Sequence, residues 1–134
     1  MVVVDCNVLV HLLVQGKETA RARALLKADA DWHSDALIMV ELANVLALAV
    51  RAKRIAMRDA APVLTQARTV MEPGLHVAGD HEAWDAAHDF RVSAYDARYL
   101  AIARDLGVPL VTEDTKLRAA APKLTQSLAA MVGY

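Results

Sequence analysis

Four acidic residues of this 134-residue chain stand in, or at the end of, apolar runs, where folding alone does not call for a charge. They are Asp5, Glu41, Asp96 and Asp114. A buried carboxylate that lacks a partner is costly, so it must be neutralised, paired with a cation or bound to a metal. One shared metal site would account for all four.

Two of these acids lie in helical sequence. Glu41 has four apolar neighbours at helical spacing: Leu37, Ile38, Val45 and Leu48. Asp96 shares a helical face with Tyr99, Leu100 and Ala103. We therefore expect both carboxylates to point inward with the apolar face. The alternative is that each pairs with a buried arginine, for which Arg98 and Arg91 are the nearest candidates.

The other two acids follow predicted strands. The β-branched run at residues 1–4 predicts a strand that stops at Asp5, and Glu113 and Asp114 follow a predicted strand at 109–112. Ligands of open α/β sheets lie beyond the carboxyl ends of the strands. The carboxylates at the two strand ends and those of the two helices could then converge on one point. Each could instead serve only as the N-cap of the next helix.

Strands and helices alternate along the chain. The pattern predicts strands at 1–4, 32–33, 75–78 and 109–112, and helices at 8–14, 18–28, 36–54, 57–71, 81–90 and 94–106, with a short helix that stops at Pro122. Strands separated by helices predict an α/β, three-layer sandwich with a central, mostly parallel β-sheet flanked by helices. The length suits one domain over residues 1–134. The segment after Pro122 fits a last strand or a packed tail.

Four segments carry a family resemblance: DCN at 5–7, VELANVL at 40–46, YDARYLAIA at 95–103 and TEDTKL at 112–117. In order and spacing they resemble the acidic motifs of PIN-domain ribonucleases. The single-domain format is similar to that of the VapC-type toxins of toxin–antitoxin pairs. The resemblance implies a PIN-like fold and a metal-dependent endoribonuclease whose acidic cluster is formed by the four acids.

The resemblance also assigns supporting residues and partners. Asn7 and Thr112 match polar positions beside the cluster, and Glu113 is a secondary candidate for the role of Asp114. Lys116 stands where some members of the family have a further acid. A homodimer and a cognate antitoxin that covers the acidic groove are the partners implied.

The ligand type predicts the chemistry. Hard carboxylate oxygens, without thiolate or imidazole partners, suit Mg²⁺ or Mn²⁺. The ion would lower the pKa of a water that attacks a phosphodiester, and a second ion would stabilise the leaving oxygen. We expect Asp5 and Asp96 to be the principal ligands, and Glu41 and Asp114 to act directly or through water.

Charge composition limits how RNA can bind. A net charge of −1 does not describe a protein that coats nucleic acid by bulk charge, so binding must use local patches. The candidates are Arg51, Lys53 and Arg54 at the end of the Glu41 helix, and Arg98 beside Asp96. A second group, Arg21, Arg23 and Lys27, is more typical of a solvated helix face.

The remaining features set the compartment and the alternatives. A single cysteine, Cys6, favours a reducing cytoplasm and a buried core thiol, the histidine spacing argues against zinc, and no leader or membrane span is expected. Asp5 followed by Asn7 also resembles an aspartate-nucleophile phosphatase of the haloacid dehalogenase type, which needs a later lysine motif and a cap region. A catalytically inactive module that binds a partner protein is a third interpretation.

Overall fold

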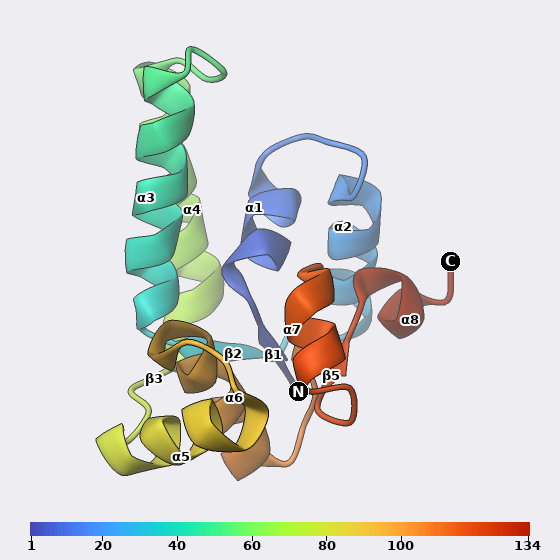
Figure 1. Ribbon diagram of the computed structural model, residues 1–134. Coiled ribbons are helices and arrows are strands. Elements are labelled where there is room, and N and C mark those ends of the chain that lie inside the picture. Colours follow the sequence, from blue (N-terminus) through green and yellow to red (C-terminus); the bar gives the residue numbers. More distant parts are fainter.

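The β-branched run at the N-terminus forms the central strand of a five-stranded sheet in the computed structural model, which describes residues 1–134 (Figure 1). The strands are β1 (Val2–Val4), β2 (Trp32–Asp35), β3 (Leu75–His76), β4 (Leu110–Val111) and β5 (Thr125–Gln126), in the order β3-β2-β1-β4-β5. Every pairing is parallel. All carboxyl ends therefore face the same edge of the sheet, as the α/β prediction requires.

Helices cover both faces. They are α1 (Cys6–Leu13), α2 (Thr19–Ala28), α3 (Leu37–Arg51), α4 (Met57–Met71), α5 (Asp80–Phe90), α6 (Ala94–Leu106), α7 (Thr115–Ala120) and α8 (Leu128–Val132), with a 3₁₀ turn η1 at Glu72–Gly74. On one side α6, backed by α5, lies across β1, β2 and β4. On the other side α1 packs against α2, α3 and α4, and α8 packs against α2. The predicted three-layer sandwich with its central parallel sheet is confirmed (Figure 1).

The core lies between the sheet and these helices. All of β1 is buried, and Tyr99 and Leu100 of α6 are fully buried against it. Gly74 is required by a close approach, because a Cβ at this position would lie 2.0 Å from the carbonyl oxygen of Trp32. Nothing larger than glycine fits between η1 and β2. None of the helices has the length and apolar character that a bilayer span needs.

Some helices and strands begin or end at other residues than predicted, because their ends are set by capping and turns and not by the periodicity of apolar residues. The first helix begins at Cys6, earlier than the expected 8–14, because Asp5 caps it. The helix expected over 36–54 ends at Arg51, and Lys53 in the following turn has a positive φ of 59°. β3 stops at His76, two residues before the predicted end at Ala78.

The chain after Pro122 forms both a strand and a helix. β5 uses only Thr125 and Gln126, and it pairs with Leu110 and Val111 of β4. The apolar run that follows is α8, capped by Ser127 through a hydrogen bond from the Ala130 amide. The segment after Pro122 therefore contains a last strand, formed by Thr125 and Gln126, and the apolar run beyond it is a packed helix.

Candidate functional site

Asp5 ends the central strand and is held in place by three donors. Its Oδ1 accepts the Cys6 amide at 2.7 Å, which caps α1. Its Oδ2 accepts the hydroxyl of Thr112 at 2.7 Å and the side-chain amide of Asn7 at 3.2 Å. The carboxylate is almost fully buried. Capping and membership of a polar site are therefore both roles of Asp5, rather than alternatives.

Asn7 and Thr112 extend this network to the end of β4. The Thr112 Oγ1 accepts the Asn7 amide at 3.2 Å and the backbone amide of Asp114 at 3.1 Å. The Asn7 Oδ1 accepts the backbone amide of Glu113 at 3.1 Å. These bonds tie the loop after β4 to the loop after β1, so they fix Asp114 relative to Asp5.

Asp114 caps the short helix α7. Its Oδ1 accepts the amides of Lys116 at 2.9 Å and Leu117 at 3.1 Å. The other carboxylate oxygen makes no hydrogen bond to protein, and the residue is half-buried. Asp114 thus keeps one oxygen for the space in front of Asp5.

Glu41 and Asp96 reach the same space from two helices, α3 and α6. Both are half-buried. The expectation that Glu41 lies within an apolar stripe is only partly correct, because its neighbour Ile38 is buried but Val45 and Leu48 are 40% and 52% exposed. The buried residues of α3 are Ile38, Leu42 and Leu46. Glu41 lies at the rim of the core.

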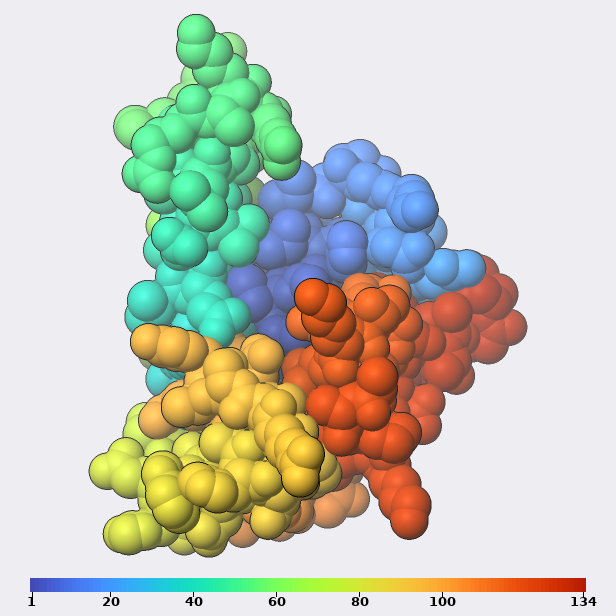
Figure 2. Space-filling model, viewed as in Figure 1, coloured from blue at the N-terminus to red at the C-terminus, as the bar shows by residue number.

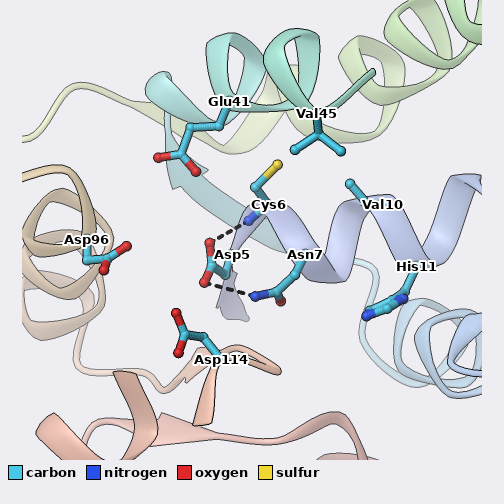
Figure 3. A pocket seen from close by; sticks show the side chains of 9 residues that line it. All are labelled: Asp5, Cys6, Asn7, Val10, His11, Glu41, Val45, Asp96 and Asp114. Carbon is cyan, nitrogen blue, oxygen red and sulfur yellow. Dashed lines mark hydrogen bonds between the residues drawn. The ribbon is translucent and has the colours of Figure 1, made fainter. Parts of the chain in front are cut away.

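The four carboxylates line one open cavity of about 330 Å³. Its lining residues are Asp5, Cys6, Asn7, Val10, His11, Glu41, Val45, Asp96 and Asp114. Figure 3 shows the carboxyl groups of the four acids turned toward a common space from four different parts of the chain. In the space-filling view the segments that carry them meet near the centre of one face (Figure 2). The sequence-predicted acids are therefore brought together.

Three of the acids have a raised pKa. Burial is the largest cause of a raised pKa at Asp5, and the charges of Asp96 and Asp114 add to it, against the hydrogen bonds from Thr112 and Cys6. Burial and then the charge of Asp5 raise the pKa of Glu41. Burial and then the charge of Asp114 raise the pKa of Asp96. Such mutual repulsion is relieved when a cation enters the cavity.

The donor set fits a hydrated divalent cation. Carboxylate and amide oxygens are the ligands that Mg²⁺ and Mn²⁺ prefer, and they are present here without a bound thiolate. In this arrangement no three of the acidic, histidine or cysteine side chains lie close enough to ligate a single ion. The carboxylates surround the cavity rather than one point, which suits an ion that keeps several of its waters.

Two neutral side chains lie close to the acids. Burial, with the charges of Glu41 and Asp5, raises the pKa of the Cys6 thiol to about 12, so it stays protonated and is no nucleophile. Burial and then the charge of Glu41 raise the pKa of Tyr99, whose hydroxyl is buried close to the Glu41 carboxylate. Cys6 is the buried thiol that the sequence predicted.

Two other predicted residues face away from the cavity. The carboxylate of Glu113 accepts the Leu128 amide at 2.6 Å, so Glu113 holds the start of α8 and does not line the cavity. Arg98 forms an ion pair at 3.1 Å with the buried carboxylate of Asp35, so it pairs with neither Glu41 nor Asp96. The prediction that places Arg98 at the centre of an RNA-binding path is not supported by this contact.

The basic candidates Arg51, Lys53 and Arg54 lie at the far end of α3. All three are exposed and have no ion pair. α3 and α4 form a helical hairpin that projects beyond the sheet, and these residues lie at its tip (Figure 1). They are therefore available to an anionic partner, at a distance from the acids along the helix.

Sequence reasoning missed Asp35 and His11. Asp35 ends β2 in the same way that Asp5 follows β1, and that position at a strand end was the available signal. His11 lines the cavity one helical turn after Asn7. Its imidazole is the only ring among the lining residues.

A family model describes almost all of this chain. The model for the PIN domain matches residues 2–123. The chain belongs to the PIN domain family. The four acids at the carboxyl edge of the sheet lie within the matched residues. Among curated proteins none matches.

Solved structures share the fold at low sequence identity. PAE2754 from Pyrobaculum aerophilum has a TM-score of 0.79 at 22% identity, over 98% of this chain and 92% of that one. FitAB bound to the IR36 DNA fragment has a TM-score of 0.72 at 17% identity, over 96% and 95% of the two chains. A toxin–antitoxin complex from Klebsiella pneumoniae has a TM-score of 0.69 at 18% identity, over 96% and 98%.

The lining of the cavity also bears on the phosphatase alternative. An aspartate-nucleophile phosphatase of that type needs a lysine close to the nucleophile. No lysine lines the cavity. Together with membership of the PIN domain family, this lining disfavours a haloacid dehalogenase-type phosphatase.

Proposed function

We propose that this PIN-domain protein is a metal-dependent endoribonuclease that hydrolyses phosphodiester bonds of RNA, with Mg²⁺ or Mn²⁺ as its cofactor. The observation that carries the proposal is the cavity lined by Asp5, Glu41, Asp96 and Asp114. Four carboxylates at one cavity have little purpose in folding, since burial and neighbouring carboxylates raise the pKa of Asp5, Glu41 and Asp96, which weakens the metal-free fold.

The residues around the cavity have different roles in this proposed reaction. A bound Mg²⁺ or Mn²⁺ would activate the attacking water and offset the negative charge of the phosphate. Asp5 and Asp96 would hold the ion, and Glu41 and Asp114 would bind it or its waters. Asn7 and Thr112 keep the Asp5 carboxylate in one orientation through the bonds described above. No side chain needs to become covalently modified.

Binding of RNA requires positive charge outside the cavity. The acids repel an RNA backbone unless a cation neutralises them, so basic residues have to guide the strand. The exposed Arg51, Lys53 and Arg54 at the tip of the α3–α4 hairpin are the best placed of the predicted candidates. Arg98 is left out of this path because it is paired with Asp35.

The partners follow from the family and its neighbours. We propose a toxin that is controlled by a cognate antitoxin, which the similarity to a toxin–antitoxin complex from Klebsiella pneumoniae supports. We further propose a homodimer. Large apolar side chains on α3 and at the start of α4 are exposed, namely Val40, Val45, Leu48 and Met57. Large exposed apolar side chains on one helical hairpin are typical of an interface.

The direct test is cleavage of single-stranded RNA with and without Mg²⁺, Mn²⁺ and EDTA. The parent should cleave internal bonds only with the divalent ion, and Asp96→Asn should not. Metal-independent cleavage, or equal cleavage by Asp96→Asn, would overturn the proposal. A folded parent that cleaves no RNA under any of these conditions would favour the inactive, protein-binding interpretation.

A further inference from the structure

One carboxylate outside the cavity accepts three hydrogen bonds, as Asp5 does, but one of its donors is a cation. Asp35 is 1% exposed at the end of β2. Its Oδ1 accepts the Ala78 amide at 2.8 Å, and its Oδ2 accepts the Leu37 amide at 2.8 Å and the Nε of Arg98 at 3.1 Å. Two amides and a guanidinium satisfy both oxygens, which is what an ionised buried carboxylate requires.

Two of these three donors come from helices that carry an acid of the site. Leu37 is the first residue of α3, one helical turn before Glu41. Arg98 lies on α6, half a turn after Asp96. Asp35 itself ends the strand that pairs with β1, the strand that Asp5 follows. One carboxylate therefore joins the strand next to Asp5 to both helices that supply acids.

Arg98 makes a second hydrogen bond that connects α6 to another part of the chain. Its Nη2 donates to the carbonyl oxygen of Ala78 at 3.5 Å, while its Nε donates to Asp35. The guanidinium thus bridges α6 to the chain that leads into α5, and α6 packs on β2. A flexible single-point contact would leave α6 free to slide along the sheet, whereas two directed bonds resist such sliding.

The pair also keeps a buried charge compensated close to the site. The carboxylate of Asp35 is buried, and the guanidinium of Arg98 at 3.1 Å offsets its charge. A variant that removes Arg98 alone leaves a buried, unpaired carboxylate beside the acids, which is the costly way to break an ion pair.

We propose that Asp35 and Arg98 are positioning residues, which set the spacing of Glu41 and Asp96 across the cavity without touching the metal or the RNA. The proposal rests on the proposed function for its catalytic readouts. It assigns to Arg98 a role that differs from the RNA contact predicted from its place beside Asp96.

The test uses Arg98→Met, Asp35→Asn and the double variant, with Arg104→Met as the matched control. Arg104 forms an ion pair at 2.8 Å with Asp89 of α5, also from α6, but this pair is exposed. The measurements are the free energy of unfolding, the affinity for Mn²⁺ without RNA, followed by the EPR signal of the free ion, and kcat and KM for RNA.

A positioning role and a purely structural role predict different results for the double variant, in its stability and in its affinity for Mn²⁺. Arg98→Met should be less stable than the parent, and the double variant should regain part of that stability because the buried charge is gone. Mn²⁺ affinity should fall by about 10- to 100-fold in both variants and stay low in the double variant, with kcat reduced more than KM. Arg104→Met should match the parent in Mn²⁺ affinity and kcat.

Two outcomes would overturn the inference. One is a double variant whose Mn²⁺ affinity and kcat return to parental values. The other is a crystal structure of the double variant in which the Glu41 and Asp96 carboxylates keep the parental spacing. The crystal structure decides the matter even if the parent binds no Mn²⁺ and cleaves no RNA, which would instead refute the proposed function.

Discussion

The hydroxyl of Thr112 donates a hydrogen bond of 2.7 Å to the carboxylate of Asp5, from a residue 107 positions away in the sequence. The same hydroxyl oxygen accepts the backbone amide of Asp114. One threonine at the end of β4 therefore orients an acid at the end of β1 and the turn that presents a second acid. Its hydrogen bond lowers the pKa of Asp5, against the raising effect of burial.

Replacing this hydroxyl should impair the site more than the fold. In Thr112→Val the Asp5 carboxylate loses a donor, so its pKa should rise further and the acidic limb of the pH–rate profile should move to higher pH. We expect kcat to fall by about 10- to 100-fold. Thr112→Ser keeps the donor and should recover most of the rate, and a Ser variant as impaired as the Val variant would contradict the assignment.

The four acids should be needed for cleavage but not for folding. Asp5→Asn, Glu41→Gln, Asp96→Asn and Asp114→Asn each remove a charge and keep the shape, and asparagine is also a good N-cap at the two capping positions. Cleavage with Mg²⁺ should fall at least about 100-fold, since loss of an outer-shell residue alone costs about 10- to 100-fold. Asp85→Asn, an exposed acid of α5, is the control. A parental rate for Asp96→Asn would refute the catalytic assignment.

The metal-free protein should lose stability as the pH rises. Asp5, Glu41 and Asp96 have pKa values above their ordinary values near 4 in the folded state, so the folded state binds protons that the unfolded state has released. The free energy of unfolding should therefore fall from about pH 4 through the raised pKa values. Thermal unfolding in EDTA checks this.

The neutral triple variant of these three acids supplies the comparison. It should lack this fall, so that its stability advantage over the parent grows with pH and then levels off. Saturating Mg²⁺ should stabilise the parent and not the variant, because only the parent binds the ion in its folded state. A parent whose stability with EDTA rises steadily above pH 4 relative to the triple variant would show that the acids do not repel one another.

Charge reversal at the tip of the α3–α4 hairpin should weaken RNA binding. The Arg51→Glu, Arg54→Glu variant should bind single-stranded RNA less tightly and with a smaller salt dependence, by about 1.4 in the log–log slope if two phosphate contacts at about 0.7 each are lost. Mn²⁺ affinity should stay parental, because the substitutions lie outside the cavity. The Arg23→Glu, Lys27→Glu variant makes the same charge change on α2. If this control loses affinity and the first variant does not, the RNA path lies on another face.

The isolated protein should be a homodimer. At micromolar concentration, light scattering should give twice the mass of 14.5 kDa. Leu48→Asp and Met57→Asp place a charge on exposed apolar positions of α3 and α4, and they should shift the mass toward the monomer. A strictly monomeric parent would remove the homodimer from the proposed function, and dimeric variants would move the interface away from this hairpin.

Local patterns determined much of the fold and the identity of the acids. The periodicity of two and of 3.6 residues placed every helix from α1 to α7 and strands β1 to β4 within a few residues, because these patterns need only neighbouring residues. Asp5 and Asp114 were found for the same reason. A polar residue at the end of an apolar run caps a helix and marks the carboxyl edge of a parallel sheet.

Only the tertiary structure decided which charges meet. Arg98 and Asp35 are 63 positions apart, and nothing near either residue indicates that β2 lies beneath α6. The half-exposed position of Glu41 depends on how α3 projects beyond the sheet, while its neighbours in sequence are all apolar. Glu113 and Asp114 are adjacent, yet the packing of α8 draws the first away and leaves the second at the cavity. Burial and pairing are set by strand order and helix packing, which bring together distant residues that a local pattern does not connect.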